Sequence, residues 1–137
     1  DVTLRSGNGQ NALHWAATGS YAIPDQNVAL VSALLDKGMP VDARDRNGFT
    51  PLIWAANRKS VKLVEFLLSR GADVNAKTTT LYNSDRTALM YAQDLATVRF
   101  LLDAGADPHT VEENGKRTWD FHKGEAAELI KEKAGAA

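Results

Sequence analysis

Short apolar clusters of two kinds alternate along the chain. The first kind combines small residues with one or two large apolar residues, at 11–17, 50–56 and 87–92. The second kind is a leucine pair that glycine follows within three residues, at 34–38, 67–71 and 101–105. Each couple of clusters predicts a short helix, a turn, a second helix and a glycine that ends it. The chain is therefore predicted to be an array of helix pairs.

One second helix shows why such units stack. Its apolar residues recur at helical spacing, at Val61, Leu63, Val64, Leu67 and Leu68. This stripe is too apolar for one helix pair to bury by itself. Stacked units join their stripes into one continuous core, so each unit depends on its neighbours for stability.

The cluster openings carry a recognisable motif. They read Asn11-Ala12-Leu13-His14-Trp15-Ala16-Ala17, Thr50-Pro51-Leu52-Ile53-Trp54-Ala55-Ala56 and Thr87-Ala88-Leu89-Met90-Tyr91-Ala92. These openings resemble the ankyrin repeat, whose motif is T-P-L-H-x-A and whose period is about 33 residues. The likeness extends over essentially the whole chain. It implies an all-α repeat fold, an ankyrin-repeat solenoid of helix-turn-helix units joined by β-hairpin loops.

The spacing of the units departs from the ankyrin period. The openings lie 39 and 37 residues apart, so the units carry insertions. Repeat one gains six residues between its helices, around 20–25, and Pro24 suits the start of the second helix. The hairpin loop after repeat two is four residues longer, through 78–83. Repeat three is shorter between its helices, which predicts a tight turn there.

The frame divides the single domain, 1–137, into five parts. We expect a partial N-terminal hairpin at 1–8, repeat one at 9–46, repeat two at 47–83, repeat three at 84–113 and a capping repeat at 114–137. In the capping repeat, Arg117 replaces the opening threonine and Trp119 takes the leucine position. The polar outer face expected of a cap consists of Lys123, Glu125, Glu128, Lys131, Glu132 and Lys133. Asp1-Val2 is in register with Asp73-Val74, so either the chain was cut from a longer one or an extended segment is its native cap.

Turn and cap residues support the same frame. Gly38, Gly71 and Gly105 are expected to end second helices in a left-handed conformation. Asn47-Gly48 and Asn114-Gly115 are expected at hairpin tips, where a positive φ is needed.

The residues before the first helices also have local roles. Thr50 and Thr87 are expected to cap these helices with their hydroxyls, and Pro51 takes the first helical position. Asp42, Asp45, Asp73 and Asp107 are expected to stabilise turns by bonding their own backbone.

Large rings and histidines first suggest chemistry. Trp15, Trp54 and Tyr91 share one repeat position, which allows a binding cage, although packing between units is favoured. His14, His109 and His122 lie in different repeats and at different repeat positions, so their spacing indicates neither a nucleophile–base pair nor a metal site. The ankyrin resemblance implies that His14 hydrogen-bonds within the stack. We expect no active site, no metal and no cofactor.

Composition adds a few bounds. The 137 residues are 44% hydrophobic and 24% charged, with a formal net charge of −1. Because cysteine is absent, disulfides and thiolate metal sites are excluded. Apolar runs are too short to span a membrane. We expect a soluble chain that is monomeric when free, either cytoplasmic or, after loss of an N-terminal signal, periplasmic or secreted.

In ankyrin-like arrays the hairpin tips and the exposed side of the first helices form a concave groove. Basic and aromatic residues gather at the corresponding positions around the second and third hairpins. The partner-binding residues that we select there are Arg44, Arg46, Phe49, Asn57, Arg58, Lys77, Tyr82 and Arg86. Phe49 has no evident core to fill, and a cluster of aromatic and arginine residues is typical of interface hot spots.

The sequence therefore predicts a non-catalytic module that binds a folded protein partner, and an enzyme that it inhibits, neutralises or tethers is one such partner. The alternative is a binder of an anionic ligand or nucleic acid through the basic hairpins. The acidic pair Glu112-Glu113 at the last hairpin and the isoelectric point of about 6.3 argue against nucleic acid.

Overall fold

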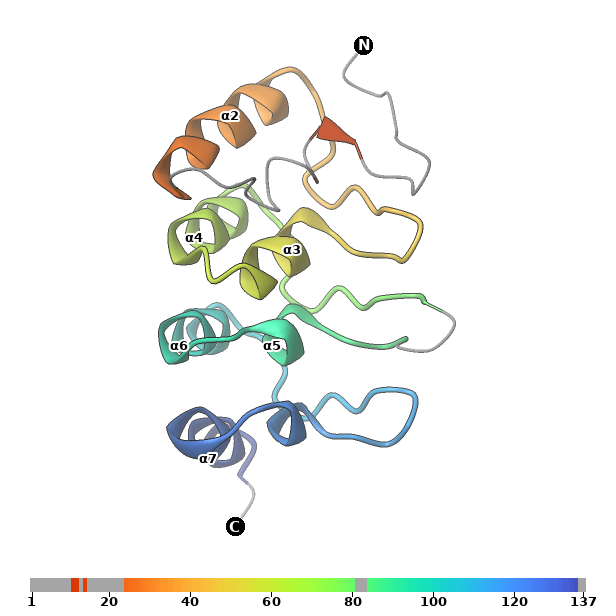
Figure 1. Cartoon of the computed structure of the whole chain (residues 1–137), viewed down its shortest axis with the longest axis vertical. Helices are drawn as coiled ribbons and strands as arrows, with labels where there is room; N and C mark the ends of the chain where they lie inside the picture. The colour runs from red at the N-terminus through yellow and green to blue at the C-terminus, as the bar shows by residue number, and fades with distance from the viewer. Residues whose placement is uncertain (1–10, 13, 15–23, 81–83, 136–137) are drawn as a thin grey trace.

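The computed structural model describes residues 11–12, 14, 24–80 and 84–135. The helices in this part are α2 (Pro24–Asp36), α3 (Pro51–Asn57), α4 (Val61–Ser69), α5 (Ala88–Tyr91), α6 (Leu95–Asp103), the 3-10 helix η1 (Thr118–Phe121) and α7 (Gly124–Lys133). They are stacked along the long axis of the molecule, and the loops between units project to one side (Figure 1). The predicted array of helix pairs is confirmed.

Two rows of helices make up the stack. The second helices α2, α4, α6 and α7 contact one another in that order, and α3, α5 and η1 form the row of first helices beside them. On α4, the side chains of Leu63, Val64 and Leu67 are completely buried. Their apolar stripe therefore faces the neighbouring units, as the periodicity predicted.

The helix ends have the residues and conformations that the sequence predicts, except at the start of α5. Gly38, Gly71 and Gly105 have φ of +94°, +89° and +97°, which confirms the left-handed helix ends. Pro24 and Pro51 each begin a helix, and the Thr50 hydroxyl accepts from the Ile53 backbone at 3.3 Å.

Thr87 does not cap α5, so that prediction was wrong. Its hydroxyl is buried and has no hydrogen-bond partner among the residues that the structure describes. The Met90 N–H donates instead to the Thr87 carbonyl at 3.1 Å. The first turn of α5 is thus tight. The Met90 N–H, which a capping hydroxyl would bind, is already bonded to the Thr87 carbonyl.

In the hairpins around Gly48 and Gly115 the positive φ falls on glycine, whereas in the hairpin between them Asp85 has φ of +63°. Gly48 and Gly115 have φ of +75° and +82°, whereas neither Asn47 nor Asn114 has a positive φ, so a positive φ was predicted correctly only for the glycines. At Gly48 a Cβ atom would lie 2.6 Å from the Thr79 backbone nitrogen of the next hairpin. This position therefore needs glycine for space as well as for its φ.

The third and fourth units are reduced. Helix α5 has 4 residues where α3 has 7, and only residues 92–94 separate α5 from α6, which confirms the tight turn. In the last unit Trp119 is half-buried, and the outer face of α7 is polar and mostly exposed. None of the helices in the described part is long and apolar enough to cross a bilayer.

Candidate protein-binding surface

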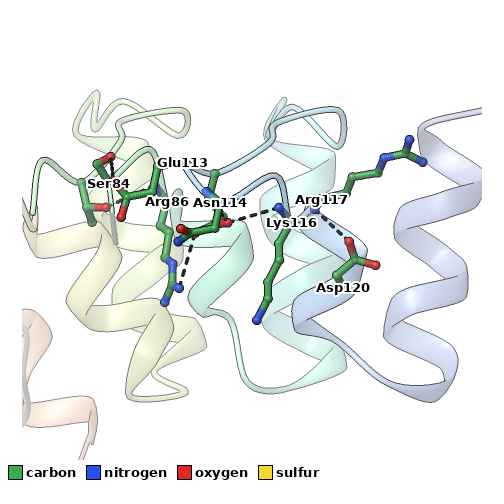
Figure 2. A network of polar contacts seen from close by, with 9 residues as sticks. Ser84, Arg86, Glu113, Asn114, Lys116, Arg117 and Asp120 are labelled. Atoms are coloured by element: carbon green, nitrogen blue, oxygen red, sulfur yellow. Dashed lines mark hydrogen bonds and ion pairs between the residues drawn. The ribbon is translucent and has the colours of Figure 1, made fainter. Parts of the chain in front are cut away.

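The hairpins are joined to one another by side chains that reach across repeats. Arg44 donates through Nη1 to the Gly48 carbonyl at 2.9 Å and to the Lys77 carbonyl of the next hairpin at 2.6 Å. Further along, the Ser84 hydroxyl donates to Glu113 Oε2 at 2.7 Å (Figure 2). Together with the exposed side of the first helices, these loops make one surface, which we call the hairpin face.

A carboxylate organises two hairpins in the same way. They are the hairpin at 43–50, the first that the structure describes and from here on called the first hairpin, and the last hairpin, at 110–117. Asp45 Oδ1 accepts from the backbone N–H groups of Asn47 and Phe49, at 2.9 and 3.0 Å. Glu112 Oε1 accepts from those of Asn114 and Lys116, at 2.8 and 3.2 Å. The predicted role of Asp45 as a turn residue is confirmed.

The other hairpin aspartates divide into two groups. Asp73 and Asp107 each accept from the backbone two residues on, at 2.9 and 2.8 Å, as predicted. Asp42 differs, because its Oδ1 accepts from the backbone N–H of Asp73 in the following unit at 3.0 Å. Its role in bonding its own turn was predicted wrongly. Stacking brings the next unit's free N–H within its reach.

Rings and cations form a continuous row along the first helices. The Phe49 ring centroid lies 4.9 Å from that of Trp54 and 5.1 Å from that of Tyr91 in the next unit. Between repeat three and the capping repeat, Arg86 lies 4.9 Å above the Phe121 ring, and Lys116 lies 5.9 Å from the same ring. The expectation that Phe49 fills no core was wrong, because it is half-buried between two rings.

Arg86 joins this row to the last hairpin. Its Nη2 lies 3.6 Å from Glu112 Oε2, whose side chain is completely buried. Burial raises the pKa of Glu112, but hydrogen bonds from Lys116 and Asn114 and the charge of Arg86 lower it, and the net direction is downward. Burial raises the pKa of Tyr91, which the Arg86 hydrogen bond and charge offset only in part. Both groups are held in their usual charge states at neutral pH.

The eight residues selected from the sequence fall into three groups. Arg44, Arg46, Arg58 and Lys77 are exposed. Phe49, Asn57 and Arg86 are half-buried, and each contacts a neighbouring unit, with Asn57 Oδ1 accepting from Gln93 Nε2 at 3.0 Å. Tyr82 lies outside the described residues.

The ring column is a packing column in the part that the structure describes. Trp54 is half-buried and donates through Nε1 to Asp45 Oδ2 at 3.1 Å. Trp15 lies outside the described residues. Phe121 also belongs to this column, and the sequence analysis did not predict it. The sequence did indicate it, because Phe121 follows Arg117 at the same spacing as Trp54 follows Thr50.

The rings of His14 and His122 bond to backbone carbonyls that are distant in the sequence. His14 Nδ1 accepts from the Asn11 N–H at 3.1 Å, so its Nε2 carries the proton that is donated to the Ala43 carbonyl at 2.6 Å. This confirms the bonding that the family resemblance implied. His122 Nε2 donates to the Leu89 carbonyl at 2.7 Å. Burial lowers the pKa of His122, against a smaller upward effect of that bond. His109 is exposed in its hairpin.

The titratable residues of the described ranges make no metal centre. In those ranges no three His, Asp or Glu side chains lie where they could hold one ion. The acids discussed above accept from backbone N–H groups, from the Ser84 hydroxyl or from neighbouring cations. The features of the hairpin face described here are therefore its row of rings and its charged side chains.

Comparison with known proteins agrees with this geometry. The family described as "Ankyrin repeats (3 copies)" matches residues 1–78, and "Ankyrin repeat" matches residues 84–112. Relatives include "Ankyrin repeat, SAM and basic leucine zipper domain-containing protein 1" of Mus musculus, 39% identical over 96 residues, and of Equus caballus, 41% identical over 95 residues. These matches cover 68% and 67% of this chain but 20% of each relative, so the chain spans about a fifth of their length. The chain belongs to the ankyrin repeat family, whose members are in general non-catalytic protein-interaction modules.

Proposed function

We propose that this chain binds a folded protein partner through the hairpin face. The observation that carries the proposal is the row from Trp54 through Phe49, Tyr91 and Arg86 to Phe121, which crosses three units without a break. Such rings are rigid and only partly buried here, and aromatic and arginine side chains supply most of the energy in protein interfaces.

Charge around the row supports the same proposal. Arg46 and Lys77 are exposed at neighbouring hairpins, and Arg58 is exposed at the end of α3. Exposed charges of one sign at the rim of an interface raise the association rate and select partners of opposite sign. The proposed partner therefore presents an acidic surface to the first two hairpins. An enzyme that is inhibited, neutralised or tethered fits this description.

The experiment separates rim charge from packing. Arg46→Glu/Lys77→Glu changes two exposed side chains, whereas replacing Phe49 or Arg86 would also disturb the stack. The control is Lys37→Glu/Lys133→Glu, which makes the same change in net charge at exposed positions on the second helices and beyond the hairpin face.

Each protein is immobilised, native extract is passed over it, and the captured partner is purified and titrated by calorimetry. The hairpin variant is expected to lose at least about tenfold in affinity, since close charge pairs across interfaces contribute more than 1.4 kcal/mol. Equal affinity for wild type and the hairpin variant would refute the proposal. Binding of single-stranded DNA or RNA whose affinity falls steeply with salt would support the nucleic-acid alternative instead. The partner's activity in the complex then shows whether it is inhibited.

A further inference from the structure

A cavity of about 660 Å³ opens beside α5, between the end of α3 and the start of α7. Its lining combines rings with charged and amide side chains, chiefly Asn57, Arg86, Tyr91, Phe121, His122 and Lys123. The volume lies within the range of about 300–1,000 Å³ that is typical of ligand sites. It adjoins the row of rings at Tyr91 and Phe121, so it belongs to the hairpin face.

The cavity exists because repeat three is short. Between Ala55 and Ser60, the N-cap of α4, repeat two has residues 56–59, whereas repeat three has only Gln93 between Ala92 and Asp94, the N-cap of α6. Helix α5 consequently ends after 4 residues. The last turn of α3 has no counterpart in the next unit, and the space below Asn57 stays open.

The acids that line this cavity are already bonded. Asp94 caps α6 by accepting from the Thr97 N–H at 3.2 Å, and Glu125 pairs with Arg99 at 3.0 Å. Lys123, in contrast, is exposed and has no ion pair among the described residues. Asp94 keeps its negative charge in this bond, so the lining offers both signs, and Lys123 is the cation in it that has no carboxylate partner among the described residues.

Arg86 adds a second donor group. Its Nε is buried without a hydrogen-bond partner in the described part of the chain, and its 3.6 Å separation from Glu112 exceeds an ordinary N–H···O hydrogen bond of about 3.2 Å or less. Glu112 is independently held by Asn114 and Lys116. Glu112 therefore keeps its hydrogen bonds if the Arg86 guanidinium, which also lies over the Phe121 ring and bonds to Tyr91, donates to an incoming acceptor.

We propose that this cavity binds an acidic peptide segment of the protein partner. A carboxylate of the segment is bound by Arg86 and Lys123, and its apolar atoms pack on Tyr91 and Phe121. This inference rests on the proposed function, because it assigns part of the partner to one place on the hairpin face.

The test uses a random heptapeptide phage library selected against the whole chain. The selected peptides are expected to share Asp or Glu at one position, and the synthetic consensus peptide is titrated by calorimetry. Lys123→Glu should weaken it at least about tenfold, as expected when a charge-assisted hydrogen bond is lost. The charge-matched control Lys133→Glu should bind as wild type does. Replacing the shared acid of the peptide by its amide should weaken binding similarly.

A second variant tests the cavity by shape. Insertion of three alanines after Gln93 restores the length of repeat two and should abolish peptide binding, with folding checked by circular dichroism. Absence of any selected peptide, selection without a shared acid, or equal affinity for Lys123→Glu and wild type would each overturn the inference.

The same variants keep this inference apart from the proposed function. If Arg46→Glu/Lys77→Glu loses the captured partner while Lys123→Glu keeps it, the cavity is not a partner site and the hairpin face still is. If the acidic peptide binds as expected but the hairpin variant keeps its partner, the cavity inference stands and the proposed use of the hairpin tips fails.

Discussion

The first hairpin (43–50) and the last (110–117) share one turn and use it differently. In each, a carboxylate oxygen accepts two backbone N–H groups around a left-handed glycine. The second oxygen differs: Asp45 Oδ2 accepts from Trp54 in helix α3, which follows its hairpin, whereas Glu112 Oε2 faces Arg86, which precedes α5 in the helix pair before its hairpin. Turn geometry is therefore local, while coupling between units depends on the second oxygen.

The residue before the N-cap of α3 and of η1 extends the contrast. Phe49 packs on rings of two units, whereas Lys116, at the same repeat position, is exposed. At this one position the first hairpin thus carries a packed ring and the last hairpin an exposed cation, although Arg44 and Arg46 of the first hairpin are exposed as well.

A cavity in the helix stack that carries both hairpins should have the largest effect on stability. Leu67 on α4 is completely buried, and Leu67→Ala should lower the free energy of unfolding by roughly 2–5 kcal/mol through lost burial and a residual cavity. The amide resonances of Gly48 and Gly115 should disappear together at a lower urea concentration. The control Glu65→Ala, on the same helix but exposed, should stay within about 0.5 kcal/mol of wild type. Separate transitions for the two glycines would show that the hairpins do not rest on one stack.

Removal of the first turn's carboxylate should have the next largest effect. Asp45→Ala leaves the N–H groups of Asn47 and Phe49 and the Trp54 indole N–H without their acceptor. These bonds are part-buried, and a net hydrogen bond contributes about 0.5–1.5 kcal/mol, so the loss of all three should cost about 1–3 kcal/mol in urea unfolding. Asp45→Glu, which copies the last hairpin, should recover part of this loss. An Asp45→Ala protein as stable as wild type would mean that glycine alone sets the turn.

Much of the fold was predictable because it depends on neighbours in sequence. Helix order, Gly38, Gly71 and Gly105 as helix ends, and Asp45 as a turn residue all follow from local backbone chemistry. The predicted repeat boundaries and the eight binding residues stay predictions.

Contacts between units could not be predicted in the same way. The bond from Asp73 to Asp42 and the packing of Phe49 on Tyr91 join residues 31 and 42 positions apart, and they depend on how closely the units stack. The shortened turn at Gln93 was readable from the sequence, but the cavity beside it follows only once α3 and η1 are placed around α5.

The last hairpin should be sensitive to acid in a way that its carboxylate explains. The pKa of Glu112 is lowered in the fold, so the folded state binds fewer protons there than the unfolded chain. Its contribution to stability is full above the unfolded pKa of about 4.3 and is lost as pH falls through the folded pKa. Glu112→Gln should lose less stability than wild type between pH 6 and pH 3, the range over which melting temperatures are compared. A parallel pH dependence of the two proteins would contradict this assignment.

The smallest effect, and a change of sign, is expected at the threonines that end the first two hairpins. Thr50→Val removes an acceptor from the Ile53 N–H and should cost about 1 kcal/mol, as loss of a helix cap does. Thr87→Val removes a buried hydroxyl that has no partner in the described part of the chain, so stability should be unchanged or rise by up to about 1 kcal/mol. The two replacements have the same shape, and urea unfolding of each against wild type isolates the hydroxyl. Equal losses at both positions would mean that the Thr87 hydroxyl has an acceptor or donor in solution, and that α5 begins in the same way as α3.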